Sequence, residues 1–232
     1  MLVAGFPAGP WGTNCWVVAV GAGAECLVID PGKDVASGLS EVLRENRLRP
    51  VAVLLTHGHI DHMWSVTPVS ADYGIPAYIH PADRERLTDP SLSRGATSQA
   101  LLAASGGQLQ FQEPAEVREL ADGLVLELAG VALRVNHAPG HTQGSVAFTV
   151  DLPDEPLMFS GDLLFAGSVG RTDLAGGDPD AMLASLARVA LSQPDNMTVC
   201  PGHGQTTTIG QERMSNPYLQ QSTSGNSTRR GL

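Results

Sequence analysis

Four side chains able to bind a metal ion stand within six residues, directly after the apolar run at 51–55: His57, His59, Asp61 and His62. Imidazole nitrogen and carboxylate oxygen suit zinc and its borderline neighbours among the transition metals. A cysteine-based structural zinc site is disfavoured, because no cysteine lies near this stretch. Since a buried strand would deliver the cluster to a loop, the pattern predicts a catalytic metal centre.

Further candidate ligands follow other expected strands: one of His137 or His141, then Asp162, then His203. Together with the first four they make seven ligands, enough for two ions held ~3.5–4 Å apart. Asp162 stands alone just past a strand end, so we expect its carboxylate to bridge the ions. His137 and His141 are separated by Ala-Pro-Gly, so a turn must aim one of them inward, and spacing alone does not choose between them.

Two other polar residues occupy expected strand ends. Asp30 precedes Pro31-Gly32, so it either steadies a ligand histidine or belongs to an ordinary turn, and the two interpretations are evenly balanced. His80 is a lone histidine for which we expect a place in the core or on the surface rather than a ligand role.

The elements that must position these residues begin with a hairpin of buried strands, expected at 15–20 and 25–29. A helix capped by Asp34 is expected to run to Asn46 and to lead into the strand at 51–55, because its apolar residues recur at helical spacing. The next segments predict a helix weakened by a proline, a strand, and a short helix started by a proline, at 63–73, 77–80 and 81–87.

The second half of the chain predicts more strands than helices. A hairpin turning at Ala129-Gly130 and a helix opened by Asp178 are the clearest signals. The expected strands lie at 124–128, 131–135, 145–150, 157–160 and 198–200. Residues 89–107 are interpreted as a mobile connection near the site, with a short helix through 99–102. We expect one domain over residues 1–219 and a disordered tail at 220–232, because the tail carries little apolar surface to offset its ordering entropy.

Bulk properties exclude several classes of protein. The net charge is −10 and Lys33 is the only lysine, so a basic surface that tracks nucleic-acid phosphates is not expected. No apolar run approaches the ~18 residues of a membrane span, and the first residues lack the basic region of a secretion signal. The three cysteines are widely spaced among apolar residues, which indicates buried thiols in a reducing compartment. We therefore expect a cytoplasmic protein that acts on a small molecule.

The motif set resembles that of the metallo-β-lactamase-fold hydrolases. It comprises His-x-His-x-Asp-His at 57–62, Pro139-Gly140-His141-Thr142, Ser160-Gly161-Asp162 and Pro201-Gly202-His203-Gly204, in this order. The resemblance spans residues 1 to about 219 and implies an α/β fold, the αββα four-layer sandwich. It also implies which residues share an ion: His57, His59 and His141 bind one, Asp61, His62 and His203 bind the other, and Asp162 bridges. His137 then has a supporting or structural role.

The resemblance is closer to the glyoxalase II-like branch, on Gly170-Arg171-Thr172-Asp173-Leu174 and Asn216-Pro217-Tyr218. The chain resembles a short form of this branch, without the C-terminal helical domain that typically holds glutathione. The identity of the thiol carrier is therefore left open. The implied activity is hydrolysis of a thioester such as S-D-lactoylglutathione by a metal-bridging hydroxide, with Asp61 and Asp162 as catalytic residues. Arg171 is the candidate contact to a substrate carboxylate, unless it pairs with Asp173.

The implied cofactors are two divalent ions, zinc first, with iron or manganese as alternatives. Two divalent ions carry four positive charges, and the negative charges of Asp61, Asp162 and a hydroxide neutralise three of them. About one positive charge remains to stabilise a developing oxyanion. The alternative activity is an iron-dependent persulfide dioxygenase on the same fold, with one iron on His57, His141 and Asp162. Hydrolysis of a lactone, a β-lactam or another ester ranks below thioester cleavage.

Overall fold

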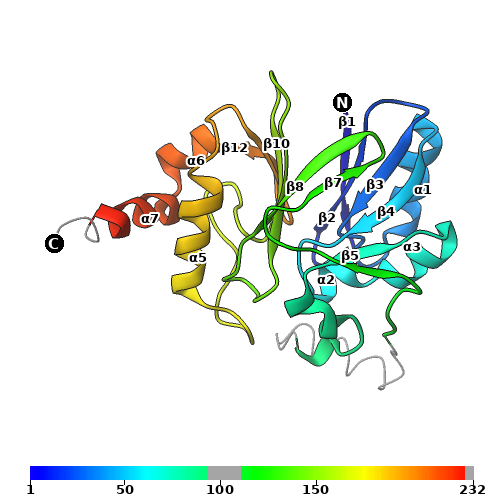
Figure 1. Cartoon of the computed structure of the whole chain (residues 1–232), viewed down its shortest axis with the longest axis horizontal. Helices are drawn as coiled ribbons and strands as arrows, with labels where there is room; N and C mark the ends of the chain where they lie inside the picture. The colour runs from blue at the N-terminus through cyan, green and yellow to red at the C-terminus, as the bar shows by residue number, and fades with distance from the viewer. Residues whose placement is uncertain (93–110, 228–232) are drawn as a thin grey trace.

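A computed structural model describes residues 1–92 and 111–227, and two six-stranded sheets carry helices on both outer sides (Figure 1). The predicted αββα four-layer sandwich is confirmed. The expected connection at 89–107 falls largely on residues 93–110, which lie outside the described residues together with 228–232.

The first sheet has the strand order β1-β2-β3-β4-β5-β6, with antiparallel pairing from β1 to β3 and parallel pairing from β3 to β6. The outer helices on this side are α1 (Ala36–Asn46) and α3 (Val66–Tyr73) (Figure 1). The strands are β1 (Leu2–Ala8), β2 (Thr13–Ala19), β3 (Glu25–Ile29), β4 (Arg49–Leu54), β5 (Ala77–Ile79) and β6 (Val117–Glu119).

The second sheet has the order β12-β11-β10-β9-β8-β7, and β10 and β11 form its parallel pair. Its strands are β7 (Val125–Leu128), β8 (Val131–His137), β9 (Val146–Val150), β10 (Leu157–Gly161), β11 (Thr198–Pro201) and β12 (Thr207–Thr208). The helices on its outer side are α5 (Pro179–Ser185), which continues in the π-helical turn η3 (Leu186–Ala190), α6 (Ile209–Ser215) and α7 (Pro217–Ser227) (Figure 1).

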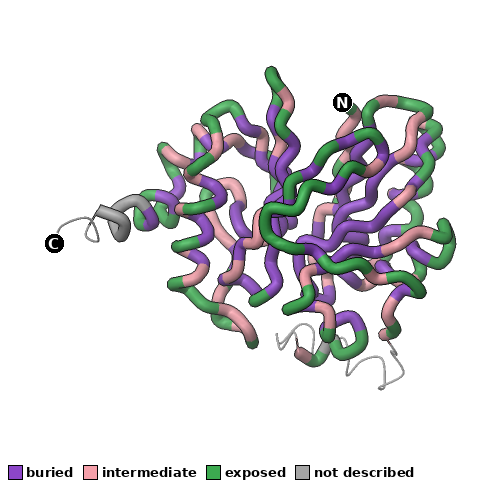
Figure 2. The backbone as a smooth tube through the Cα atoms, viewed as in Figure 1, coloured by how far each residue is buried: buried purple, intermediate pink, exposed green. Residues whose placement is uncertain are grey.

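Side chains of β2 show why the strand sequences are apolar throughout. Cys15 and Val17 belong to the core shared with α1 and α3, whereas Trp16 and Val18 belong to the core between the two sheets. Because successive side chains point to opposite faces and both faces are covered, no polar alternation remains in the central strands. Figure 2 shows the buried residues concentrated along these strands.

Both hairpins expected from the sequence are present, as β2–β3 and β7–β8. The second turns at Ala129 and Gly130, which both have positive φ (53° and 72°), as a tight hairpin turn requires. The three cysteines are buried and free, as expected. Within the described parts of the chain, no helix has the length and apolar character needed to cross a membrane.

Two local expectations were wrong. Asp34 does not cap α1: Val35 occupies the cap position, while Asp34 has a positive φ of 58° and pairs with Lys33. The helix expected at 63–73 is divided into α2 (Ile60–Met63) and α3, and Pro68 lies in the first turn of α3, where its missing N–H costs nothing. The tail expected at 220–232 begins within α7, and its last residues, 228–232, lie outside the described part of the chain.

Candidate metal centre

The predicted ligands converge because strands from both sheets end at the same place. The 57–59 loop follows β4, Asp162 follows β10 and His203 follows β11, and each of these strands belongs to a parallel pair whose carboxyl ends share an edge. The loop between β8 and β9 supplies His141. Two backbone bonds join the sheets here: Val146 N–H donates to Thr56 O (2.8 Å), and Asn14 N–H donates to Gly202 O (2.7 Å).

All seven predicted ligands lie in one cluster, in groups whose ligand atoms are within 4.8 Å of one another. The buried trio consists of His57, His59 and His141, and the acidic trio consists of Asp61, His62 and His203. A third group joins Asp162 to His57 and His62.

Distances within the acidic trio match the spacing of ligands around an ion. Nitrogen and oxygen ligands ~2.0–2.1 Å from a tetrahedral ion lie about 3.3 Å from each other. In the acidic trio, His203 Nε2 lies 3.1 Å from Asp61 Oδ2 and 3.3 Å from His62 Nε2. In the buried trio, His59 Nδ1 lies 2.7 Å from His141 Nε2, which is closer than that spacing.

Asp162 faces both trios with different oxygens. Its Oδ1 lies 3.3 Å from His62 Nε2, and its Oδ2 lies 3.3 Å from His141 Nε2. The chain passes so close here that a Cβ on Gly202 would lie 2.3 Å from Asp162 Oδ1. The glycine before His203 is therefore required by the position of the predicted bridging carboxylate.

Hydrogen bonds behind the cluster select which nitrogen each histidine turns inward. Asp30 Oδ2 accepts hydrogen bonds from Thr56 Oγ1 (2.6 Å) and from His62 Nδ1 (2.9 Å). Because the Thr56 hydroxyl proton goes to Asp30, Thr56 Oγ1 must accept from His57 Nδ1, 3.1 Å away. Both histidines thus carry a proton on Nδ1, and each turns its Nε2 toward the site.

His141 follows the same rule with a backbone partner, since its Nδ1 donates to the carbonyl of Arg171 at 2.7 Å. Asp30 is buried, so the first of its two sequence interpretations, the support of a ligand histidine, is the one that the structure shows. Buried partners of this kind fix the orientation of a ligand ring and raise its basicity.

Unpaired buried atoms test whether the cluster fits a metal. Among the described residues, His57 Nε2, His59 Nε2 and Asp162 Oδ1 are buried side-chain atoms of the cluster without a hydrogen-bond partner. Such groups are rare in folded proteins because each loses its hydration without replacement. Two of the three, His57 Nε2 and Asp162 Oδ1, point into the group that joins His57, His62 and Asp162, so the residues present fit a bound cation.

The two trios differ electrostatically. Burial, followed by the neighbouring histidines, lowers the pKa of His57 well below its ordinary value, and burial and His141 do the same for the pKa of His59. Burial also acts to lower the pKa of His62, but the carboxylates of Asp162, Asp61 and Asp30 outweigh it and raise the pKa well above its ordinary value. Burial acts to raise the pKa of Asp61, and His62 and His203 outweigh it, bringing the pKa to about 2.

His137, the alternative that spacing left open, lies outside the cluster. Its Nε2 donates to Gln143 O at 2.9 Å, and its ring stacks on that of His80 at 4.2 Å between centroids. His80 also accepts a hydrogen bond from Ala82 N–H, so both histidines have structural partners, as expected for His80.

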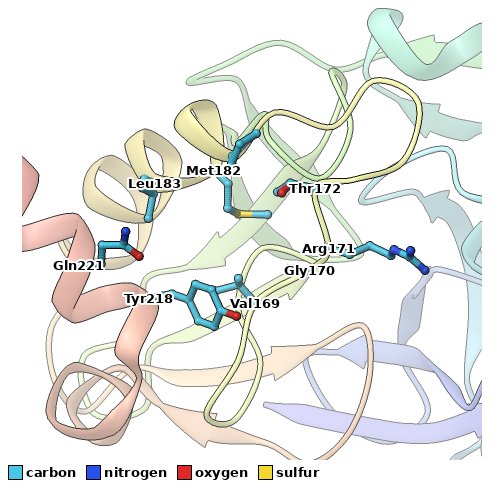
Figure 3. A pocket seen from close by; sticks show the side chains of 9 residues that line it. Val169, Gly170, Arg171, Thr172, Met182, Leu183, Tyr218 and Gln221 are labelled. Atoms are coloured by element: carbon cyan, nitrogen blue, oxygen red, sulfur yellow. The ribbon is translucent and has the colours of Figure 1, made fainter.

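Arg171 is paired rather than free. Its Nε and Nη2 donate to the two carboxylate oxygens of Asp173, at 2.6 and 2.7 Å, and both side chains are more than half exposed. A pocket of about 350 Å³ lies beside this loop, lined also by Met182, Leu183 and Tyr218. Figure 3 shows the guanidinium extending away from these three side chains.

Three supporting residues were missed in the sequence. Thr13 donates through Oγ1 to Asp61 Oδ2 (3.2 Å), Thr56 orients His57, and Asp83 bonds to two of the ligand-bearing loops. Thr56 did carry a signal, because it is a polar residue at the end of an expected strand, whereas Asp83 falls within the short helix expected at 81–87. Thr13 carried none, since its partner is 48 residues away.

Comparison with known proteins places the chain among hydrolases of this kind. The chain is 46% identical over 224 residues to an uncharacterized protein of Mycobacterium bovis, covering 95% of this chain and 98% of that one. It is 33% identical to the probable metallo-hydrolase YqgX of Bacillus subtilis, covering 92% and 95%, and 32% identical to the hydroxyacylglutathione hydrolase GloC of Haemophilus influenzae, covering 83% and 86%.

Solved structures give the same fold. BLEG-1, described as a B3 metallo-β-lactamase, superposes with a TM-score of 0.82 at 37% identity, covering 94% of this chain and 99% of that one. TTHA1623 in a di-iron-bound form superposes with a TM-score of 0.75 at 38% identity, covering 93% and 99%. ETHE1 from Myxococcus xanthus superposes with a TM-score of 0.72 at 21% identity, covering 97% and 92%, which shows a shared fold.

The family model described as the metallo-beta-lactamase superfamily matches residues 8–203, a range that contains every predicted ligand. With its two-sheet fold and a cluster of histidines and aspartates that fits a metal, the chain belongs to the metallo-β-lactamase superfamily and is a metallo-hydrolase.

Proposed function

We propose that the protein hydrolyses a thioester such as S-D-lactoylglutathione with two divalent ions, most simply zinc. The buried trio holds one ion, the acidic trio holds the other, and Asp162 bridges them. The observation that carries the proposal is the convergence of these residues from separate loops around the unpaired His57 Nε2 and Asp162 Oδ1. Similarity to a hydroxyacylglutathione hydrolase supports the thioester over other esters.

Bound divalent ions would supply Lewis-acid chemistry, which brings the pKa of a coordinated water toward ~7 and stabilises negative charge on a carbonyl oxygen. Residues of the chain orient the ligand rings and the attacking water. Asp30, Thr56 and the Arg171 carbonyl accept the Nδ1 protons of His62, His57 and His141, so that the Nε2 atoms of these rings face the site. Asp61, anchored by the Thr13 hydroxyl, would orient the attacking water through its carboxylate.

The reaction balances with water alone. Addition of hydroxide to the thioester carbonyl gives a tetrahedral alkoxide, whose collapse breaks the carbon–sulfur bond and releases a thiolate and a carboxylic acid. A thiolate leaves readily near neutral pH because the pKa of a thiol is ~8.5. The exposed Arg171 would contact a substrate carboxylate by exchanging one of its bonds to Asp173.

The test uses protein stripped of metal and reloaded with zinc, iron or manganese, one metal at a time. Release of thiol from S-D-lactoylglutathione, measured with a thiol-reactive dye, is the expected result, with two ions per chain by elemental analysis. Oxygen uptake that depends on a persulfide and on iron, without thiol release from thioesters, would identify a persulfide dioxygenase and overturn the proposal.

Hydrolysis of β-lactams is the second candidate, favoured by the similarity to BLEG-1. The same protein samples should be assayed with a chromogenic cephalosporin and a lactone. A kcat/KM for the cephalosporin above that for every thioester tested would move the assignment to β-lactam hydrolysis.

A further inference from the structure

Asp83 is a fully buried carboxylate outside the predicted ligand set. It lies in the short 3₁₀ helix η1 (Pro81–Leu87), which follows β5. Its Oδ2 accepts hydrogen bonds from Gly58 N–H at 2.8 Å and from Thr142 Oγ1 at 2.6 Å. Its Oδ1 accepts from Gly144 N–H at 3.0 Å. One side chain therefore takes three hydrogen bonds from two separate loops.

Those two loops carry all three residues of the buried trio. Gly58 stands between His57 and His59, and Thr142 directly follows His141. Residues 58 and 142 are far apart in sequence, and Asp83 Oδ2 holds both at hydrogen-bond distance. Because His59 and His141 face each other at 2.7 Å, a change at Asp83 would alter the spacing of their nitrogens.

The backbone is shaped to admit this carboxylate. A Cβ on Gly144 would lie 2.6 Å from Asp83 Cγ, and a Cβ on Gly58 would lie 2.7 Å from Arg86 Cδ. Any larger residue at either position would push the ligand-bearing loops away from η1. The glycine of His-x-His and the glycine three residues after His141 thus serve the same contact.

Arg86 supplies the charge that a buried carboxylate needs. It is 7% exposed, and its Nε lies 3.4 Å from Asp83 Oδ1. Its Nη1 donates to Leu92 O and its Nη2 donates to Ala175 O, which lies in the segment between Asp162 and α5. A buried charge is costly unless it is paired and hydrogen-bonded, and this pair meets both conditions.

We propose that Asp83 is a positioning residue that sets the geometry of the His57, His59 and His141 trio by joining its two loops. This inference rests on the proposed two-ion centre, but it concerns metal affinity rather than the substrate. Asp83 does not touch the ion site and acts through Gly58, Thr142 and Gly144. Removing such a support typically lowers metal affinity 10- to 100-fold.

The experiment compares Asp83→Asn with a matched variant, Glu212→Gln. Glu212 is equally buried and also takes three hydrogen bonds, from Thr207 Oγ1, Gly167 N–H and Asn216 Nδ2, but it lies in α6 and these bonds reach neither of the two loops that carry the buried trio. Both substitutions keep the side-chain volume and replace one acceptor oxygen with a donor. Zinc affinity is measured by chelator competition, with cobalt absorption spectra as a second readout of ligand geometry.

We expect Asp83→Asn to weaken one of the two zinc-binding steps at least tenfold and to change the cobalt spectrum. Glu212→Gln should leave both steps within twofold of the wild type. In a His203→Ala background, where only the buried trio is intact, Asp83→Asn should weaken the remaining step by the same factor. Equal zinc affinities in Asp83→Asn and the wild type would overturn the inference.

Thr142 provides a second pair of variants in case Asp83→Asn does not fold, as judged by circular dichroism. Thr142→Val removes one donor to Asp83, and Thr142→Ser keeps it. A several-fold loss of zinc affinity in Thr142→Val, restored in Thr142→Ser, supports the inference, and equal affinities in both overturn it. The two proposals can fail separately. Wild-type protein that binds only one ion would overturn the proposed two-ion function, whereas variants with unchanged zinc affinity would overturn the inference about Asp83.

Discussion

The buried trio and the acidic trio both face Asp162 but are built in opposite ways. His57, His59 and His141 are 1–5% exposed and include no carboxylate, and the bonds of Asp83 join their two loops. In the acidic trio, Asp61 and His203 keep 18% and 28% of their side chains exposed, and Asp30 and Asp162 add further negative charge around His62.

This difference separates two ways of preparing a metal site. Burial lowers the pKa of His57 and His59, so these ligands are already unprotonated at neutral pH and the protein must only hold them at the right spacing. In the acidic trio, negative charge raises the pKa of His62 and His203 in the metal-free protein, against the effect of burial. That trio attracts a cation strongly, but it must release protons to bind one.

Removal of the metal should have the largest effect, because it disables both trios at once. We expect a strong chelator to abolish hydrolysis and to lower the melting temperature, since each ion present at 100 times its dissociation constant adds ~2.7 kcal/mol to the free energy of unfolding. Calorimetry with and without chelator measures this, and re-addition of zinc is the control. Unchanged melting and activity in the chelator would contradict the metal centre.

Asp162→Ala should be next, because Asp162 is the residue that faces both trios. We expect kcat/KM to fall at least about a thousandfold, which corresponds to ~4 kcal/mol of transition-state stabilisation. Metal content should fall below two ions per chain. Asp195→Ala, at an exposed aspartate paired with Arg213, is the control. Activity that persists with both ions bound would show that the bridge assignment is wrong.

Asp30→Asn should separate the trios. The amide keeps the volume of the side chain but removes the negative charge that accepts from His62 Nδ1. We expect the zinc affinity of the acidic trio to fall about 10- to 100-fold. The effect on the buried trio should be smaller, because Asp30 reaches His57 only through Thr56. Chelator competition that shows equal losses at both steps would remove the distinction between the trios.

The pH dependence of zinc affinity should also distinguish the two trios. A histidine whose pKa is raised holds its proton at neutral pH and loses it only at higher pH, so zinc must displace that proton, and affinity falls about tenfold per pH unit for each proton displaced. We therefore expect a steeper loss of affinity from pH 7.5 to 5.5 in His59→Ala, which keeps the acidic trio, than in His203→Ala, which keeps the buried trio. Parallel slopes in the two variants would contradict the electrostatic difference.

The sequence predicted those ligands of the centre that come directly after a clearly recognisable strand. His57 to His62 are contiguous, and Asp162 and His203 come directly after buried strands, so strand ends alone brought them together. Sequence spacing could not decide between His137 and His141, because the choice depends on a turn and on the stacking of His137 with His80. Only the resemblance to a family decided it.

Supporting contacts were harder to predict because they join distant segments. Thr13 reaches Asp61 across 48 residues, and Asp83 reaches Gly144 across 61, with no local pattern in either case. The missed strands and helices have the same cause. β6 and β12 are short edge strands, and α7 is a polar helix in whose described part Leu219 and Ser222 are buried.

Arg171 offers the smallest and most specific test, because it lies beside the buried trio without belonging to it. Its carbonyl accepts from His141, whereas its side chain forms an exposed fork with Asp173. We expect Arg171→Ala to keep that carbonyl and to raise KM about three- to tenfold for a thioester that carries a carboxylate, with kcat unchanged. KM for a thioester without a carboxylate should not change. Arg213→Ala, which breaks another exposed Arg–Asp pair, is the matched control. If KM for both substrates matches the wild type in Arg171→Ala, the fork with Asp173 is purely structural and the carboxylate is recognised elsewhere.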